Sequence, residues 1–278
     1  MLQTKHIQPN YITVKSDHDG LIVECLQDAI LNCRSKGGSP KALYINPCGC
    51  NPTGTVLSES RKGLIYELAC KYDFLILEDD PYSYLDYSEE PTVSFLQLDT
   101  EGRVIRLESF SKTVSAGLRL GFIIAPKPLV YVMGNITSTT TIHTSMLPQM
   151  MISRLFDTWG IDGFLKKTKI TRDFYRNQRD VMLKAADKHL KGLCEWTVPS
   201  GGFFLWLKVP QIEDTETFFL EYGLERGVAC SPGTCFSSDP SIPSQYIRVS
   251  YSTTNEEDMD KGFRILADAI REVIKLEE

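Results

Sequence analysis

The segment FLILEDDPY, residues 74–82, begins with four consecutive apolar residues and then changes abruptly to three acids. A short apolar run of this kind, closed by acids and a proline, is typical of a strand that is buried on both faces. Three other segments share this character: residues 41–45, VIRLESFSK at 104–112 and LRLGFIIAP at 118–126. Together the four segments predict the strands of one central sheet.

A helical pattern lies between the first two of these strands. Ser58 has a side chain suited to an N-cap. Leu64, Ile65 and Leu68 recur after it at helical spacing. Alternation of near-continuous apolar strands with helices is typical of parallel strands joined by crossover helices. The sequence therefore predicts an α/β fold with a mostly parallel central sheet and helices on both of its faces.

The pattern changes after about residue 160, where a long helix is expected. The predicted elements of this part are a helix over 163–191, strands over 201–209 and 246–252, and a closing helix over 256–275. Elements in this order are typical of a smaller α+β unit. We therefore expect a partial large domain over residues 1–175 and a C-terminal small domain over 176–278, with the boundary inside the long helix.

Composition and charge argue against several classes of function. The chain of 278 residues has a formal net charge of −6 and an isoelectric point near 5.4, which argues against nucleic acid as its main partner. No apolar run approaches the ~20 residues that cross a bilayer, so no membrane span is expected. The first residues, MLQTKHIQPN, have the pattern of neither a secretory nor an organellar targeting signal.

The eight cysteines are scattered and form no CxxC pair, which favours reduced thiols in a cytosol-like compartment. Cys48 and Cys50 flank a glycine in PCGCNPTG, but they supply at most two metal ligands, and no other Cys or His cluster completes a tetrahedral site. A disulfide between these two cysteines would be strained. We therefore expect no metal, and we expect Asn51 rather than either thiol to be the functional residue of this loop.

Polar side chains gather where the predicted strands end. Ligands of open α/β sheets bind beyond the carboxyl ends of the strands, and the residues found there are Asn51, Asp79, Tyr82, Ser109, Ser111 and Lys112. A lysine such as Lys112, directly after a buried strand, is most often a surface charge. At the mouth of a sheet it can instead lose its proton and form a Schiff base. Ser109, Ser111 and Arg119 would make a phosphate site beside it, which favours the second interpretation.

Three more side chains each have a functional and a structural interpretation. Asp79, at a buried strand end, needs a cation or hydrogen bonds, which a protonated pyridine nitrogen would supply. The alternative is an acid that is exposed in a loop or paired with an arginine, and this role suits the neighbouring Asp80 better. Tyr82 can point into the same crevice as Asp79 or simply pack as an aromatic side chain. Arg248, inside a predicted strand, can clamp a substrate carboxylate or form an internal salt bridge.

Five motifs occur in one order across most of the chain. They are NPTG (51–54), DDPY (79–82), SFSK (109–112), GLRLG (117–121) and IRVSYS (247–252). Together they resemble the fold-type I, pyridoxal-phosphate-dependent aminotransferases of class I/II. The segments YELACKYDFLILEDDPY and GRVIRLESFSKTVSAGLRLGF are especially similar to the kynurenine/α-aminoadipate aminotransferase subgroup. Each motif alone is weak, whereas the five in order are specific.

The resemblance implies a catalytic role for three residues. Lys112 would bind pyridoxal 5′-phosphate as a Schiff base and then act as the general base. Asp79 would pair with the pyridine nitrogen of the cofactor. Tyr82 would hydrogen-bond the phenolic oxygen of the ring together with Asn51, and the Asn51–Pro52 peptide bond would be cis as in relatives.

The resemblance also implies the remaining contacts of the site. Ser109, Ser111 and Arg119 would hold the cofactor phosphate. Arg248 would grip the carboxylate of the amino acid, with Asn51 beside it. The implied reaction is ping-pong transamination between an aromatic or dicarboxylic 2-amino acid, similar to kynurenine or 2-aminoadipate, and a 2-oxo acid such as 2-oxoglutarate. A lyase with the same site and a non-catalytic scaffold stay open as alternatives.

The chain begins later than the family pattern does. Its start, MLQTKHIQPNYITVKSDHDGL, resembles the middle of the family's large domain, so the resemblance implies that the N-terminal third is missing. That section would supply further cofactor contacts and much of the interface of the homodimer expected by resemblance. We therefore expect a fragment or a shortened form with an incomplete cofactor site. The expected location is cytoplasmic, or mitochondrial if a targeting segment preceded the first residue.

Overall fold

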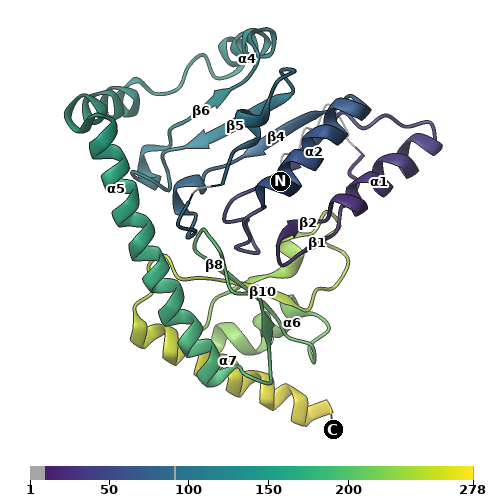
Figure 1. Cartoon of the computed structure of the whole chain (residues 1–278). Coiled ribbons are helices and arrows are strands. Elements are labelled where there is room, and N and C mark those ends of the chain that lie inside the picture. The colour runs from purple at the N-terminus through teal and green to yellow at the C-terminus, as the bar shows by residue number, and fades with distance from the viewer. Residues whose placement is uncertain (1–9, 91, 278) are drawn as a thin grey trace.

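Two four-stranded β-sheets organise the structure, a computed structural model that describes residues 10–90 and 92–277 (Figure 1). The strands of the first sheet, in spatial order, are β3 (Ala42–Ile45), β4 (Leu75–Asp79), β5 (Val104–Ser109) and β6 (Gly121–Ile124). β3, β4 and β5 are parallel, and β6 runs antiparallel to β5. All four predicted strands are present, and the mostly parallel α/β class is confirmed.

The core beside the first sheet is built from α1 (Val23–Ser35), α2 (Glu59–Tyr72) and the short α3 (Phe95–Leu98). Ser58 is the N-cap of α2, as predicted, and its hydroxyl accepts a hydrogen bond from the Arg61 N–H at 3.3 Å. Ile65 of α2 is fully buried against Ile76 of β4 and its neighbours. Leu64, in contrast, is exposed, because it lies on the opposite side of α2 from this core.

The second sheet has the spatial order β7 (Glu195–Trp196), β8 (Phe204–Lys208), β10 (Tyr246–Ser250) and β9 (Ser231–Pro232), and all its pairs are antiparallel. It packs with α7 (Glu256–Glu277), whose buried residues Met259, Phe263, Leu266 and Ile270 follow helical spacing. The antiparallel sheet and closing helix agree with the predicted α+β part.

α5 (Met146–His189) runs along one side of the molecule from the first sheet to α7, against which it packs (Figure 1). Gly160 has non-helical backbone angles (φ 61°, ψ −174°), which divide α5 into two segments. The second segment corresponds to the helix predicted over 163–191. The first segment and α4 (Lys127–Thr140) were not predicted as helices. The domain boundary between residues 175 and 176 lies inside α5 and stays a prediction; residues 1–9 lie outside the described residues.

Short elements complete the described chain. They are the antiparallel pair β1 (Ser16–Asp17) and β2 (Gly20–Leu21), α6 (Thr215–Phe218), the 3₁₀ turns η1 (Ser83–Leu85), η2 (Ala116–Leu118), η4 (Leu224–Arg226) and η5 (Gly233–Phe236), and the π-helical turn η3 (Phe219–Gly223). None of the helices in the described ranges is long and apolar enough for a membrane crossing.

The loop that contains PCGCNPTG packs on the loop that leads into β8. A Cβ atom on Gly49 would lie 2.4 Å from the backbone nitrogen of Gly202, so only glycine allows this approach. The Ser200 N–H donates to the Gly54 carbonyl at 2.9 Å, and the Gly202 N–H donates to the Leu85 carbonyl at 3.0 Å. The glycine between the two cysteines therefore joins the two sheet-containing parts. All eight cysteines are free thiols.

Candidate active site

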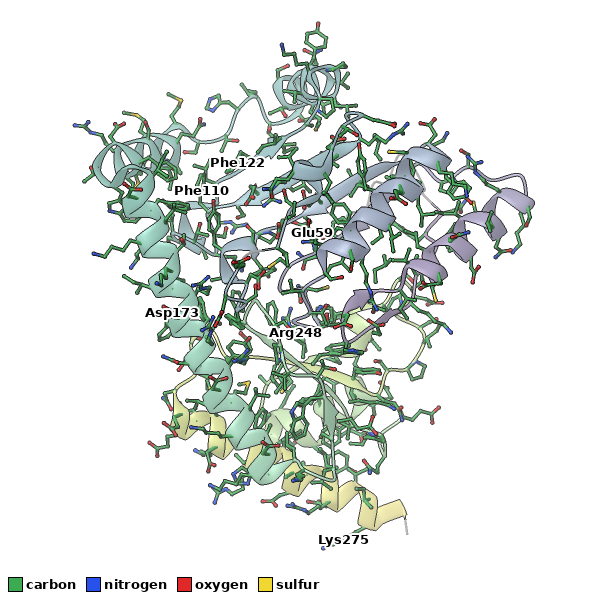
Figure 2. All side chains as sticks on the ribbon, in the orientation of Figure 1. Glu59, Phe110, Phe122, Asp173, Arg248 and Lys275 are labelled. Atoms are coloured by element: carbon green, nitrogen blue, oxygen red, sulfur yellow. The ribbon has the colours of Figure 1, made fainter. Side chains whose placement is uncertain are left out.

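The strand ends of the first sheet bring most of the predicted residues to one edge. Asp79 is the last residue of β4, Ser109 the last residue of β5, and Lys112 follows three residues later. Asn51 lies in the loop after β3. Arg248 projects from β10 of the second sheet and lies in the middle of the molecule (Figure 2). The candidate site therefore lies between the two sheets.

Lys112 is partly buried beside aromatic rings, not extended into solvent. Its Nζ atom lies 5.1 Å from the ring centroid of Phe203 and 5.9 Å from that of Tyr82. Burial lowers the pKa of Lys112, and the positive charges of Arg119 and Arg248 lower it further. A lysine in these surroundings holds its proton less tightly than a surface lysine does. The geometry thus favours a nucleophilic or basic amine over a simple surface charge.

Asp79 is held by Tyr44 of β3 and by Asn46, which directly follows β3. The Tyr44 hydroxyl donates to Asp79 Oδ2 at 2.5 Å, and Asn46 Nδ2 donates to the Asp79 carbonyl oxygen at 2.5 Å. Asn46 also accepts a hydrogen bond from the Asn51 N–H through its Oδ1, at 2.8 Å. Sequence reasoning did not single out Tyr44 and Asn46. In an extended segment, a spacing of two residues points both side chains to the same face, and this spacing was the signal available.

Tyr82 is 6% exposed and packs edge-on against Phe203 and Phe204, with centroid distances of 5.4 Å and 6.1 Å. Burial raises the pKa of Tyr82 to about 12; nearby Arg248 opposes this shift, and Asp79 adds to it. The phenol is thus protonated at neutral pH. Both interpretations of Tyr82 hold in part, since the ring is packed and it also lies near Lys112, Asp79 and Arg248.

Arg248 connects the two parts of the site. Its Nη1 donates to Asn51 Oδ1 at 2.7 Å, and its Nη2 donates to Ser231 Oγ at 3.2 Å. The guanidinium carbon lies 4.2 Å from the ring centroid of Phe204 and 4.8 Å from that of Phe236. Its Nε atom is buried and has no hydrogen-bond partner. No ion pair within the described ranges involves Arg248, so the predicted alternative of an internal salt bridge is absent there.

The NPTG loop has the backbone form expected from the resemblance. The Asn51–Pro52 peptide bond is cis. Asn51 is exposed; its side-chain Oδ1 accepts a hydrogen bond from Arg248, and its backbone N–H donates to Asn46 Oδ1. The side-chain Nδ2 of Asn51 is a further donor at the same edge.

The predicted phosphate residues lie together at the end of β5. The Ser111 N–H donates to Ser109 Oγ at 3.1 Å. Arg119 Nη1 lies 3.5 Å from Ser111 Oγ and 3.3 Å from the Ala116 carbonyl oxygen, within hydrogen-bond range of both. Two hydroxyls and an exposed guanidinium suit a phosphate group, which accepts several charge-assisted hydrogen bonds.

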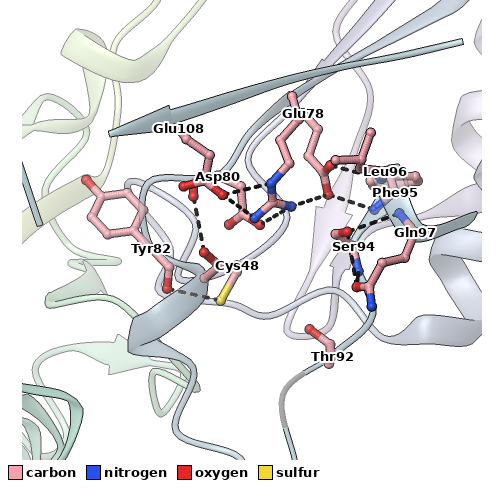
Figure 3. A network of polar contacts seen from close by, with 12 residues as sticks. Cys48, Glu78, Asp80, Tyr82, Thr92, Ser94, Phe95, Leu96, Gln97 and Glu108 are labelled. Carbon is pink, nitrogen blue, oxygen red and sulfur yellow. Dashed lines mark hydrogen bonds and ion pairs between the residues drawn. The ribbon is translucent and has the colours of Figure 1, made fainter. Parts of the chain in front are cut away.

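A buried ion network lies behind the site and supports the ends of β4 and β5 (Figure 3). Arg106 is surrounded by Glu78, Asp80 and Glu108, at 3.2 Å, 2.9 Å and 2.5 Å respectively. The expectation that Asp80 pairs with an arginine is thus met, although Asp80 is buried. Glu78 also accepts hydrogen bonds from the N–H groups of the first turn of α3, at 2.7 Å and 3.2 Å. The alternation of β4 therefore directs Glu78 and Asp80 away from Asp79.

One group in the described part of the chain has side chains spaced for a metal ion, namely Asp17, His18 and Asp19. Asp17 is already bound by Arg61, at 2.7 Å and 2.8 Å, and this hydrogen bonding lowers the pKa of Asp17 to about 2. His18 and Asp19 are exposed on the surface. The group lies at the β1–β2 turn, outside the candidate site, and the expectation of no metal stays a prediction.

Comparison with known proteins identifies relatives of one kind. Residues 2–266 match the family model described as "Aminotransferase class I and II". A mouse (Mus musculus) protein named kynurenine/alpha-aminoadipate aminotransferase, mitochondrial, is 46% identical over 269 residues, which cover 95% of this chain and 63% of the mouse protein. A Bos taurus protein of the same name is 43% identical, with the same coverage of 63%. The chain thus spans less than two thirds of the length of these curated relatives.

Solved structures agree with this result. The fold resembles a kynurenine aminotransferase from Pyrococcus horikoshii in complex with PMP, with a TM-score of 0.89, 32% identity and coverage of 95% of this chain and 64% of that chain. It also resembles an alpha-aminoadipate aminotransferase from Thermus thermophilus complexed with N-(5′-phosphopyridoxyl)-L-leucine, with a TM-score of 0.87, 29% identity and coverage of 96% and 67%.

Proposed function

The chain belongs to the aminotransferase class I and II family, and from this membership we propose that it transfers an amino group between a 2-amino acid and a 2-oxo acid with pyridoxal 5′-phosphate as cofactor. One observation carries the proposal. Lys112, an amine with a lowered pKa, lies over the ring of Phe203, and Arg248, which has a buried, unpartnered N–H, lies over the ring of the neighbouring Phe204. The centroids of these two rings are 4.7 Å apart. An amine and a carboxylate clamp at one edge suit an amino acid as substrate.

The donor set of the site fits pyridoxal phosphate. Ser109, Ser111 and Arg119 form a cluster of the kind that binds phosphate. At the neighbouring strand end, Asp79 offers a carboxylate for a pyridinium nitrogen. The protonated phenol of Tyr82 and the amide of Asn51 offer hydrogen bonds to a ring oxygen, since phenol and amide N–H groups are donors. When bound, the cofactor supplies an electron sink that stabilises the charge left by a broken Cα–H bond.

Each residue of the site has a separate role in the proposed reaction. Lys112 is the catalytic base, because its lowered pKa leaves the amine able to take a proton from the substrate Cα and to give it up again. Arg248 and Asn51 orient the substrate through its carboxylate, and the Arg248 Nε is free to donate. The buried rings of Phe203 and Phe204 give Lys112 and Arg248 apolar neighbours, which lowers the local dielectric around both cations.

The substrates that we propose are aromatic or dicarboxylic 2-amino acids similar to kynurenine and 2-aminoadipate, with 2-oxoglutarate as the acceptor. The names of the mouse, Bos taurus, Pyrococcus and Thermus relatives support this class. The lyase and scaffold alternatives gain no support from these names. Phe204 and Phe236, on the two sides of the Arg248 guanidinium, add an apolar surface suited to an aromatic substrate side chain.

We further propose that the chain forms a homodimer in a reducing compartment, the cytoplasm or the mitochondrial matrix. Exposed apolar residues gather on β6, on α4 and at the start of α5, and such patches mark interaction surfaces; they are Phe122, Ile123, Ile124, Val130, Tyr131, Val132, Ile136, Met146, Leu147, Met150 and Met151. The eight free thiols fit a reducing compartment. A light-scattering mass of 31.4 kDa, that of one chain, would contradict the dimer.

A coupled assay tests the proposed activity. The chain is incubated with pyridoxal phosphate, kynurenine or 2-aminoadipate, and 2-oxoglutarate, and glutamate formation is measured. We expect glutamate to form with the wild-type chain, and we expect Lys112→Ala to lower the rate at least a hundredfold, in line with the loss of a general base (roughly 10²–10⁴). Formation of a 2-oxo acid without glutamate would contradict transamination, and an unchanged rate in Lys112→Ala would contradict the role of Lys112.

A further inference from the structure

Tyr44 lies on β3, next to the strand that ends in Asp79. The parallel register places Tyr44 opposite Leu77 and Ile45 opposite Glu78. With this register the tyrosine side chain reaches along the sheet to the strand end, where its hydroxyl lies 2.5 Å from Asp79 Oδ2. The backbone of Asp79 is held separately, because its carbonyl oxygen accepts from Asn46 Nδ2. Tyr44 therefore acts on the carboxylate and Asn46 on the main chain.

We propose that Tyr44 is a positioning residue for the cofactor: it fixes one carboxylate oxygen of Asp79, so that the other oxygen is presented to the pyridine nitrogen. This inference rests on the proposed function. Tyr44 itself touches neither the reacting atoms nor the substrate in the proposed arrangement, and its effect passes through Asp79.

The direction of the hydrogen bond supports this role. An ionised carboxylate only accepts hydrogen bonds, so the phenol must be the donor. The pKa of Tyr44 is raised well above its ordinary value by burial of the phenol and by the neighbouring charge of Asp79. Tyr44 thus stays protonated, and the bond to Asp79 persists, throughout the neutral pH range. Hydrogen bonds to charged groups are among the stronger ones in proteins.

The tyrosine contributes little to the apolar core. Tyr44 is 57% exposed as a whole residue. The apolar core beside β3 is formed by other residues, such as Ile45. Tyr44→Phe removes only the hydroxyl, so the variant is expected to fold normally. Loss of the hydroxyl leaves Asp79 Oδ2 without this donor, and the carboxylate is then free to rotate away from the cofactor nitrogen.

Titration of the full chain with pyridoxal phosphate, followed by absorbance, tests the proposal. We expect Tyr44→Phe to raise the apparent dissociation constant about threefold to tenfold, less than the roughly tenfold to hundredfold typical of a hydrogen bond to a charged group, because Tyr44 is partly exposed and acts on the cofactor only through Asp79. Tyr222→Phe, which removes a hydroxyl from Tyr222 of η3, outside the candidate site and the proposed dimer surface, is the matched control and should bind like the wild type. Without cofactor, Tyr44→Phe should lower the midpoint of thermal unfolding by no more than about 2–4 °C, because it loses one hydrogen bond, and Tyr222→Phe should leave the midpoint unchanged.

A double-mutant cycle separates positioning from a general structural effect. If Tyr44 acts through Asp79, Tyr44→Phe in an Asp79→Asn background should change the dissociation constant by less than about twofold. Equal effects of Tyr44→Phe in both backgrounds would overturn the proposal, as would wild-type affinity in the single variant. Failure of the wild-type chain to bind pyridoxal phosphate would overturn the proposed function itself, and the two failures are therefore distinguishable.

Discussion

Arg248 illustrates how a single side chain is prepared for a ligand. Its guanidinium is packed between Phe204 and Phe236, and two of its nitrogens already hold Asn51 and Ser231. We propose that these contacts hold the planar guanidinium in place before a substrate carboxylate binds, so that less conformational entropy is lost on binding. Burial lowers the pKa of Arg248, but a guanidinium stays charged in proteins. Nη1 and Nη2 each keep a second N–H, and Nε keeps its own, so the guanidinium still has donors for a ligand.

Arg248→Gln should therefore weaken amino-acid binding selectively. We expect the KM for the amino acid to rise about tenfold to hundredfold, because hydrogen bonds to charged groups contribute roughly 1.5–3 kcal/mol. The dissociation constant for pyridoxal phosphate should change by less than about twofold, because the phosphate and ring contacts lie elsewhere. Steady-state kinetics and cofactor titration measure the two effects.

Arg226→Gln is the control, since the guanidinium of Arg226 also stacks on an aromatic ring, that of Tyr222, outside the candidate site. An equal loss of cofactor affinity in Arg248→Gln would argue against the assigned role.

At the scale of the element, the acids at the end of β4 point to two opposite faces of the sheet and have different partners there. Asp79 faces Tyr44 and the candidate site. Glu78 and Asp80 face Arg106, which three carboxylates share. Asp80 Oδ1 is buried without a hydrogen-bond partner, and burial raises the pKa of Asp80 to about 7. Arg106 opposes this rise, and the other charged groups around Asp80 are Glu78, Glu108 and Lys62.

The raised pKa of Asp80 predicts a pH dependence of stability. The folded chain holds this proton to higher pH than the unfolded chain, whose Asp80 has the ordinary value of 3.8. The stabilising contribution is thus complete below about pH 4 and is lost as the pH rises through about 7. Asp80→Asn has no such proton, so its unfolding free energy should fall less steeply over this range than that of the wild type.

Denaturant unfolding at several pH values between 4 and 8 measures this difference, in the wild type, in Asp80→Asn and in Asp268→Asn. Asp268, exposed on α7, pairs only with Arg271 at 3.1 Å in the described contacts and serves as the control. Parallel pH profiles for the wild type and Asp80→Asn would show that the buried carboxyl is not the source of the slope.

At the scale of the whole molecule, the site exists only because the two sheet-containing parts meet. Lys112 and Asn51 belong to the first part, and Phe203, Phe204 and Arg248 belong to the second. The close approach of Gly49 and Gly202 holds these parts together, and α5 spans both. The first part alone lacks Arg248, and the second part alone lacks Lys112. The exposed apolar residues on β6 and α4 form the surface at which we propose that the homodimer assembles.

Much of this arrangement could be predicted from the sequence, because the informative residues follow short, strongly apolar strands. The end of β4 at Asp79 and the position of Lys112 after β5 are of this kind. Tyr44 and Asn46 could not be assigned, since their partners depend on the register of β3 against β4. α4 was not predicted, although Leu129, Val132 and Ile136 recur at helical spacing and were an available signal. The role of Gly49 was also hidden, because the residues that approach it are about 150 positions away.

Covalent attachment of pyridoxal phosphate to Lys112 is the most direct test of the account. The full chain is incubated with the cofactor, reduced with borohydride, digested, and the labelled peptide is identified by mass. We predict one labelled site, Lys112 in the SFSK segment, and loss of that label in Lys112→Ala. Lys62, a buried lysine whose Nζ donates to Thr92 Oγ1 at 3.0 Å and to the Val93 carbonyl at 2.8 Å, should stay unlabelled. An unlabelled Lys112 in the wild-type chain would contradict the account.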